Sequence, residues 1–201
     1  MGFYLELIRA VFQAADQDGR LRNRIVAFTA AAPGEGVSYV VNTLAKEIAT
    51  HTQRRVLAVD SLGLQNIRVA DPNQIAQHCS ETQMDNLLTL PAEAEGLVGY
   101  RRPATINGWH TDPDYRLSCI KALRWNFDYA LVDCPSLGVS SDATTLAPIV
   151  DGVAIVVEAG RTRRDQIQRA QKLIEQAGGN FLGFVLNQRR YPVPGWLFRK
   201  L

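Results

Sequence analysis

Five short apolar runs constrain the fold of this chain more than any other feature. They cover residues 25–28, 56–59, 129–132, 153–157 and 181–186. Near-continuous runs rich in β-branched residues are typical of strands in a parallel sheet that is covered on both faces. Helical patterns fall between the runs, and this alternation predicts a three-layer α/β fold with a mainly parallel central sheet.

Helical periodicity is clearest over residues 164–177, where apolar residues recur on one face and Gly178-Gly179 supplies the stop. Residues 40–48, after the first strand, have the apolar spacing of a helix that packs on a sheet. Residues 61–115 are less regular. Within that stretch only residues 86–90 are expected to form a strand.

Composition limits the classes of function. At 201 residues with 46% hydrophobic content, the chain is expected to form a single domain over residues 1–201. A net charge of +2 is too small to indicate a nucleic-acid partner, so none is expected. The three cysteines show no CxxC spacing, which indicates neither a disulfide framework nor a zinc site and favours a reducing cytosol. Because no apolar run approaches the roughly 18 residues of a membrane span, we expect a soluble, cytoplasmic chain.

The segment TAAAPGEGVSYVVNTLA, residues 29–45, joins the first expected strand to the first expected helix. Pro33, Gly34, Glu35 and Gly36 permit a tight turn whose backbone N–H groups point inward, and the helix N-terminus adds its positive end. The order of strand, loop and helix predicts a phosphate-binding loop, or P-loop. These four residues are therefore expected to bind a nucleotide.

Val37, Ser38 and Tyr39 complete the predicted nucleotide-binding segment. Ser38 is at the position whose hydroxyl ligates magnesium, and Val37 is at the position of the lysine that reaches the β- and γ-phosphates. Valine has neither charge nor donor, so rapid phosphoryl transfer is not expected, whereas ATP or ADP can still bind through the backbone. The alternative is a glycine-bearing turn that binds no ligand.

Two aspartates end later strands in the expected order. Asp60 ends RRVLAVD and Asp133 follows YALV in FDYALVDCP. Ligands of open α/β sheets sit at the carboxyl ends of the strands, and Mg²⁺ prefers oxygen ligands. Ser38, Asp60 and Asp133 are therefore the expected metal ligands, and the two aspartates are the catalytic candidates if the protein is an active enzyme. For either aspartate alone, the alternative is a helix cap or a turn former.

With these motifs the chain resembles the cytoplasmic domain of bacterial tyrosine kinases of the polysaccharide co-polymerase system, within the MinD/ParA class of deviant Walker P-loop ATPases. PGEGVS is similar to their PGEGKS loop, VLAVDSLG to their second acidic motif, and FDYALVDCPSLGVSSDA to their Walker B region. VVEAGRTRRDQ and GFVLNQRRY are similar to the segments that close their sheet. The resemblance covers residues 25–60 and 125–191 well.

The resemblance implies further roles. Asn187 corresponds to a position that contacts the adenine base, although a strand-ending turn residue is the alternative. Asp142 matches a nucleotide-sensing switch or caps the next short helix. Residues 1–22 resemble the leading helix through which subunits meet, so a homo-oligomer is implied. The implied partner is an inner-membrane polysaccharide co-polymerase or another export component, which would place the chain at the inner face of the membrane.

Three departures from the family pattern point away from catalysis. Val37 replaces the lysine, and Leu62 stands where the family commonly carries a second aspartate. The family's C-terminal tyrosine cluster has no counterpart, because Tyr191 is the only tyrosine in residues 188–201. Together the departures indicate a pseudokinase.

Two basic segments keep open interpretations. Residues 189–201, RRYPVPGWLFRKL, mix basic and aromatic side chains that suit an anionic membrane or a groove on a membrane protein, or form an ordinary packed tail. Arg161, Arg163 and Arg164 form either a solvated face or a contact for phosphate or a partner.

Three functions follow. The first is a regulatory or adaptor protein, a pseudokinase of bacterial exopolysaccharide or capsule synthesis and export, that binds ADP or ATP weakly with Mg²⁺. The second is an active tyrosine kinase or ATPase in which another cation replaces the lysine. The third is a MinD/ParA-like positioning ATPase. PGEGVS favours the first two over the third, and Val37 with Leu62 favours the first over the second.

Overall fold

The computed structural model describes residues 24–52, 54–65, 80–81, 87–90 and 112–188. Its strands are β1 (Arg24–Ala30), β2 (Val56–Asp60), β3 (Ser80–Glu81), β4 (Leu87–Leu90), β5 (Tyr129–Asp133), β6 (Gly152–Glu158) and β7 (Phe181–Asn187). Its helices are α2 (Val37–His51), α3 (Ser61–Gln65), α6 (Pro113–Asn126), α7 (Asp142–Leu146) and α8 (Arg164–Gln176). All five apolar runs form strands, and the weaker strand expected at residues 86–90 is β4.

The strands form one seven-stranded sheet in the order β3-β4-β2-β5-β1-β6-β7. Every neighbouring pair is parallel except β3 with β4. The predicted three-layer fold with a mainly parallel sheet is therefore confirmed. Because parallel strands share one carboxyl edge, the segments that follow β1, β2, β5 and β6 meet at that edge.

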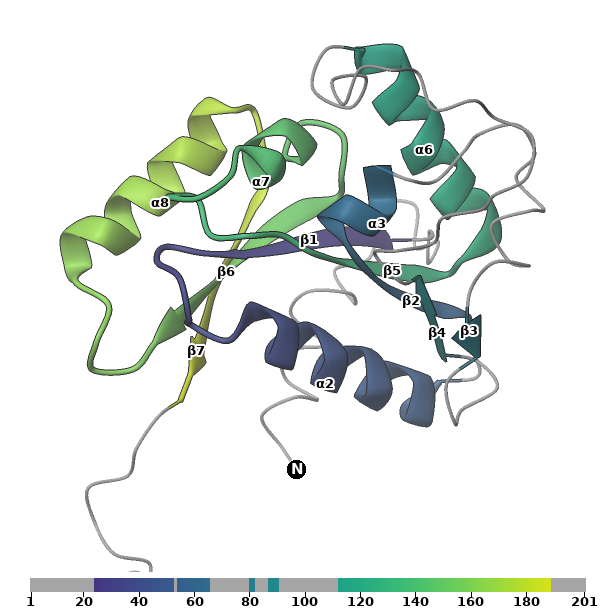
Figure 1. The fold of residues 1–201 in the computed structure, drawn as a ribbon, viewed down its shortest axis with the longest axis horizontal. Coiled ribbons are helices and arrows are strands. Elements are labelled where there is room, and N and C mark those ends of the chain that lie inside the picture. The colour runs from purple at the N-terminus through teal and green to yellow at the C-terminus, as the bar shows by residue number, and fades with distance from the viewer. Residues whose placement is uncertain (1–23, 53, 66–79, 82–86, 91–111, 189–201) are drawn as a thin grey trace, which may run out of the picture.

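Helices cover both faces of the sheet (Figure 1). On one face lies α2, whose Val40 and Leu44 pack in a buried cluster with Phe28 of β1. On the other face lie α6, α7 and α8, and a second buried cluster there includes Leu123 and Ile174. The two apolar faces of the central strands explain why the strands read as near-continuous apolar runs rather than as alternating ones.

Helix α6 begins in the stretch whose elements the sequence did not assign. The Asp112 carboxylate accepts hydrogen bonds from the backbone N–H groups of Asp114 at 3.0 Å and Tyr115 at 3.2 Å. Pro113 occupies the first helical turn. Aspartate at the N-cap followed by proline is a typical helix start, so the local sequence explains why α6 begins at this point.

Asp151, which precedes β6, fixes the end of the sheet at which the central parallel strands begin. Its carboxylate accepts two hydrogen bonds from the Arg124 guanidinium of α6, at 2.9 and 3.0 Å. It also accepts the backbone N–H of Ile25 in β1 at 2.6 Å. One side chain therefore joins α6, β1 and β6 at the end of the sheet that is remote from the P-loop.

Several predicted segments lie outside the described residues. They are the leading helix at residues 1–22, the tail at residues 189–201 with Tyr191, and most of residues 66–111. Within the part of the chain that the structure describes, no helix combines the length and the apolar character that crossing a bilayer requires.

Candidate nucleotide-binding site

The predicted P-loop connects β1 to α2. Gly34 and Gly36 both have φ of 84°, a left-handed backbone conformation that favours glycine. Gly36 is the N-cap of α2, and it provides no side chain to cap the helix. The first N–H groups of this 15-residue helix have no partner inside the helix, so they face the loop as donors. The backbone therefore retains the features that favour a bound anion.

A cavity of about 400 Å³ lies against this loop. It is lined by residues 32–38 of the loop, by residues 133–136, which are the last residue of β5 and the three that follow, and by Ala30 and Val139. Its volume is within the range of small-molecule sites. Six of the eight residues predicted to bind nucleotide, residues 33–38, line it, whereas Tyr39 and Asn187 do not.

The lining of this cavity, as the structure describes it, includes no lysine, arginine or histidine. Val37 is only 9% exposed and packs in the same buried cluster as Phe28 and Val40. The side chain at the lysine position thus packs in the core and offers an anion neither a charge nor a hydrogen-bond donor. Any anion in the cavity would depend on backbone N–H groups, hydroxyls and an accompanying cation.

Asp60 and Asp133 end adjacent strands and are register partners in the β2–β5 pair. Burial raises the pKa of the Asp133 carboxyl above its usual range, a hydrogen bond with the Ser38 side chain opposes this shift, and the charge of Asp60 adds to it. Asp60 accepts a hydrogen bond from the backbone N–H of Gly63. The three predicted metal ligands, Ser38, Asp60 and Asp133, therefore come together at the carboxyl edge of the sheet.

The chemistry of these groups fits Mg²⁺. Two carboxylates and a hydroxyl are hard oxygen donors, and a divalent cation would offset the repulsion between Asp60 and Asp133. Among the described residues, no group of three or more His, Cys, Asp and Glu side chains is gathered that could hold a metal. The described residues therefore offer part of a coordination shell, as is usual where Mg²⁺ keeps waters and binds phosphate oxygens.

Asp142 is the first residue of α7 and is hydrogen-bonded to the first residue of α3, which directly follows Asp60. Its buried carboxylate accepts a hydrogen bond from the Ser61 hydroxyl at 2.6 Å, which links α3 to α7. The N-cap of α7 is Ser141, so the capping interpretation of Asp142 was wrong. Neighbouring Cys134 is fully buried, and burial followed by the charges of nearby aspartates raises the pKa of its thiol. Cys134 is therefore a protonated core residue.

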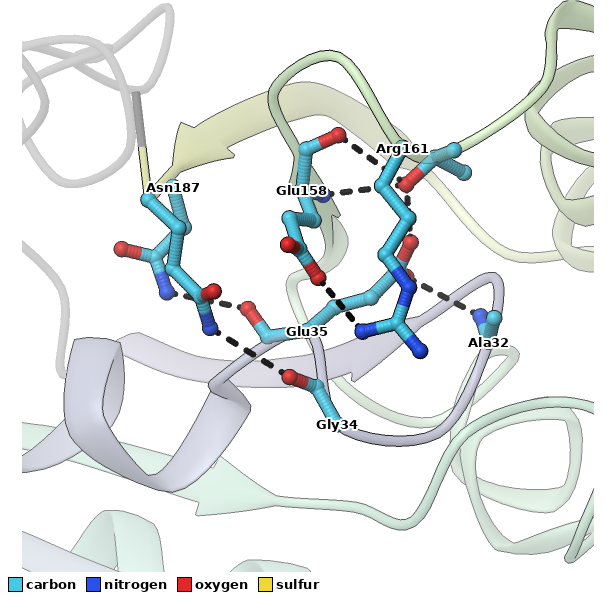
Figure 2. A network of polar contacts seen from close by, with 8 residues as sticks. Ala32, Gly34, Glu35, Glu158, Arg161 and Asn187 are labelled. Atoms are coloured by element: carbon cyan, nitrogen blue, oxygen red, sulfur yellow. Dashed lines mark hydrogen bonds and ion pairs between the residues drawn. The ribbon is translucent and has the colours of Figure 1, made fainter. Parts of the chain in front are cut away.

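The Glu35 side chain links the P-loop to the segment that follows β6 (Figure 2). Its side chain is 2% exposed. One carboxylate oxygen accepts the Ala32 backbone N–H at 3.0 Å, and the other accepts the Thr162 hydroxyl. The Thr162 hydroxyl in turn accepts the backbone N–H of Glu158 at 3.0 Å. Arg161 pairs with Glu158 at 2.9 Å, on the outside of this network.

The end of β7 holds the same loop through side-chain amides. Asn187 donates to the backbone carbonyl of Glu35 at 2.9 Å, and Gln188 donates to that of Gly34 at 3.3 Å (Figure 2). A Cβ added at Gly36 would lie 2.4 Å from the Asn187 amide nitrogen. Asn187 is thus placed against the loop, and its expected contact with adenine stays a prediction.

Two residues of the site were missed in the sequence. Ser136 lines the cavity, and its buried hydroxyl has no hydrogen-bond partner among the described residues. Its position three residues after Asp133, at the carboxyl edge of the sheet, could have marked it. Thr162 carries no local pattern that would reveal its bond to Glu35, because 127 residues separate the two.

The mainly parallel sheet and the glycine-rich loop between β1 and α2 together give the chain a three-layer, P-loop NTPase-like fold. The structure is similar to the chimerical protein CapA2B2, with a TM-score of 0.71 and 19% identity over 94% of this chain and 84% of that one. It is also similar to the septum site-determining protein MinD of Pyrococcus horikoshii, solved with Mg-ADP, with a TM-score of 0.56 and 20% identity over 88% of this chain and 76% of that one. At such low identity these likenesses show the fold alone.

Comparison with known sequences gives more specific information than the fold does. No family model matches the chain. The chain is 27% identical to the tyrosine-protein kinase CpsD of Streptococcus agalactiae over 202 residues, which is 92% of this chain and 82% of CpsD. Its homologues are therefore bacterial tyrosine kinases of the CpsD, CapB and YwqD type, and the resemblance inferred from the motifs is confirmed.

Proposed function

We propose that this protein is a regulatory or adaptor pseudokinase of bacterial exopolysaccharide or capsule synthesis and export, which binds ADP or ATP weakly. The observation that carries the proposal is the placement of Val37. The lysine position is filled by a buried core residue, and the described residues that line the cavity beside it include no cationic side chain. The developing charge of a transferred phosphoryl group would lack its nearest side-chain cation, which opposes catalysis more than it opposes binding.

Nucleotide binding would use the residues that remain. The backbone N–H groups at Gly34, Gly36 and the start of α2 would hold the phosphates. Ser38, Asp60 and Asp133 would hold Mg²⁺, whose charge would replace part of what the lysine supplies. Losing one charge-assisted contact typically costs about 1.5–3 kcal/mol, a roughly tenfold to hundredfold loss of affinity.

Other residues have secondary places in the proposal. Tyr39 is 63% exposed beside Ser38, and Asn187 lies against the loop, so both would be near the nucleoside rather than the phosphates. Residues 1–201 would form one domain. It would act in the cytoplasm at the inner face of the membrane, with a polysaccharide co-polymerase or another export component as partner, and as a homo-oligomer.

Calorimetric titration of the full chain with ADP and ATP, with and without Mg²⁺, tests the binding half of the proposal. We expect weak binding that requires Mg²⁺. An assay of autophosphorylation and ATP hydrolysis tests the catalytic half, and we expect negligible activity. Turnover on the order of 1 per second or faster, within the ordinary enzymatic range, would contradict the pseudokinase assignment.

An active kinase or ATPase is the second candidate, favoured by one observation. Ser38, Asp60 and Asp133 lie together at the carboxyl edge of the sheet, so they could still serve as the metal-binding part of a phosphoryl-transfer site. A cation from another protein or another copy of the chain would then have to replace the lysine. Activity that appears only with an added partner would support this candidate over the pseudokinase. The third candidate, a MinD/ParA-like positioning ATPase, rests on the shared fold alone.

A further inference from the structure

We propose that Glu35 and Thr162 form a latch that fixes the P-loop before any ligand arrives, and that both are positioning residues for anion binding. The latch is the pair of hydrogen bonds that the Glu35 carboxylate accepts from the Thr162 hydroxyl and the Ala32 backbone N–H. The effect of the latch on anion binding rests on the proposed nucleotide-binding function. The effect of the latch on the order of the loop is independent of that function.

The burial of Glu35 indicates that the folded protein depends on the two hydrogen bonds of the latch. A carboxylate that is 2% exposed loses its hydration, and such a group is stable only when it is hydrogen-bonded or paired. Both Glu35 oxygens are bonded, one to backbone and one to a hydroxyl. The neighbouring cation does not provide the compensation, because the Arg161 guanidinium pairs with Glu158.

Thr162 connects the P-loop to the central sheet, because it is hydrogen-bonded both to Glu35 and to the end of β6. Its hydroxyl accepts the backbone N–H of Glu158, the last residue of β6, and its own N–H donates to the Glu158 carbonyl at 3.2 Å. The amides of Asn187 and Gln188 hold the Glu35 and Gly34 carbonyls from β7. Segments far apart in sequence thus converge on the loop (Figure 2).

This arrangement matters because the loop lacks its lysine. A flexible loop must lose backbone freedom when it closes on an anion, and that loss opposes binding. A loop held by its own protein contacts avoids much of this cost. The latch would therefore preserve measurable affinity in a site whose strongest ligand contact is missing.

Four variants of the full chain test the proposal. Thr162→Val removes the hydroxyl at nearly constant shape, and Thr162→Ser restores it. Glu35→Met keeps about the length of the side chain but can neither accept nor donate either hydrogen bond, and it serves if Thr162→Val does not fold. Arg161→Gln is the matched control, because it alters only the exposed ion pair with Glu158. The readouts are ¹⁵N order parameters of Gly34, Glu35 and Gly36 without ligand, and the Kd for Mg-ADP by calorimetry.

We expect the order parameters to fall from about 0.85 toward 0.6 or below in Thr162→Val and Glu35→Met. The Kd for Mg-ADP should rise roughly tenfold in the same two variants, since their loop must lose its backbone freedom when it closes on the ligand. Thr162→Ser and Arg161→Gln should match the unaltered protein in both readouts. Unchanged loop order in the two latch variants would overturn the latch, and a fall in order without a change in Kd would overturn the positioning role.

The two proposals fail in different ways. If the unaltered protein does not bind Mg-ADP at all, the proposed nucleotide function is wrong, while the order parameters still decide whether the latch exists. If the unaltered protein binds and Thr162→Val binds equally well, the nucleotide function stands and the positioning role of the latch is wrong.

Discussion

Asp60 of β2 and Asp133 of β5 are register partners in adjacent parallel strands, so two carboxylates lie together at the carboxyl edge of the sheet. Burial is the main cause of the raised pKa of Asp133, and the charge of Asp60 adds to it. Two like charges on neighbouring residues of adjacent strands are tolerated where a cation is bound between them or where one group takes up a proton.

We predict that Asp133→Asn stabilises the ligand-free protein near neutral pH. A raised pKa in the folded state means that folding favours the protonated carboxyl, so this stability is full below the unfolded pKa of about 3.9 and is lost as pH rises through the folded value. Asparagine is neutral throughout and still accepts a hydrogen bond from Ser38. Thermal midpoints should therefore be higher for the variant at pH 7 and should converge with the original at acidic pH.

Mg²⁺ provides the control for that experiment. The cation should raise the midpoint of the unaltered protein by stabilising the charged carboxylate, and it should have little effect on Asp133→Asn. A variant that is less stable than the unaltered protein at pH 7 would contradict this account of the acidic pair.

We predict that Ser136→Ala has opposite effects on stability and on binding. The buried Ser136 hydroxyl lacks a partner among the described residues, and an unsatisfied buried polar group costs about 1–3 kcal/mol. Its removal should leave the ligand-free protein equally stable or more stable in urea unfolding. Because Ser136 lines the cavity, affinity for Mg-ADP should fall. Equal affinity would show that the hydroxyl does not reach the ligand.

We predict that Gly36→Ala is more harmful than Gly34→Ala. Both glycines have φ of 84°, so alanine is strained at either position by about 1–3 kcal/mol. Only at Gly36 would the added Cβ meet the Asn187 amide, at 2.4 Å, whereas nothing lies within 4 Å at Gly34. The difference between the two variants in unfolding free energy and in Mg-ADP affinity isolates the contact with Asn187. Equal losses would mean that backbone strain alone explains both.

We predict that Val37→Lys improves binding without restoring kinase activity. A cation at this position should tighten Mg-ADP binding roughly tenfold or more and permit some binding in EDTA. Leu62 still stands where the family commonly carries its second aspartate, so tyrosine phosphorylation should remain negligible. Val37→Met adds length without charge and is the control. Robust autophosphorylation by the lysine variant would show that the lost lysine alone silences the protein.

The sequence by itself determined six of the seven described strands, all but β3, together with the P-loop and the acidic strand ends. These features are local: a buried parallel strand needs a near-continuous apolar run, and a left-handed turn needs glycine. The carboxyl edge of a parallel sheet then brings Asp60 and Asp133 together once the strands are known. The start of α6 was also readable from Asp112 and Pro113.

The tertiary structure decided what holds the site in place. Glu35 stands in the loop as a candidate ligand residue, but its carboxylate is bonded to Thr162, and no pattern near either residue indicates that pairing. Asn187 reaches the Glu35 carbonyl across 152 residues of sequence. Such contacts depend on which strands become neighbours, here β1 beside β6 and β6 beside β7, and on the direction of each side chain in the packed sheet. Local sequence fixes neither, because burial and long-range hydrogen bonding are properties of the assembled layers.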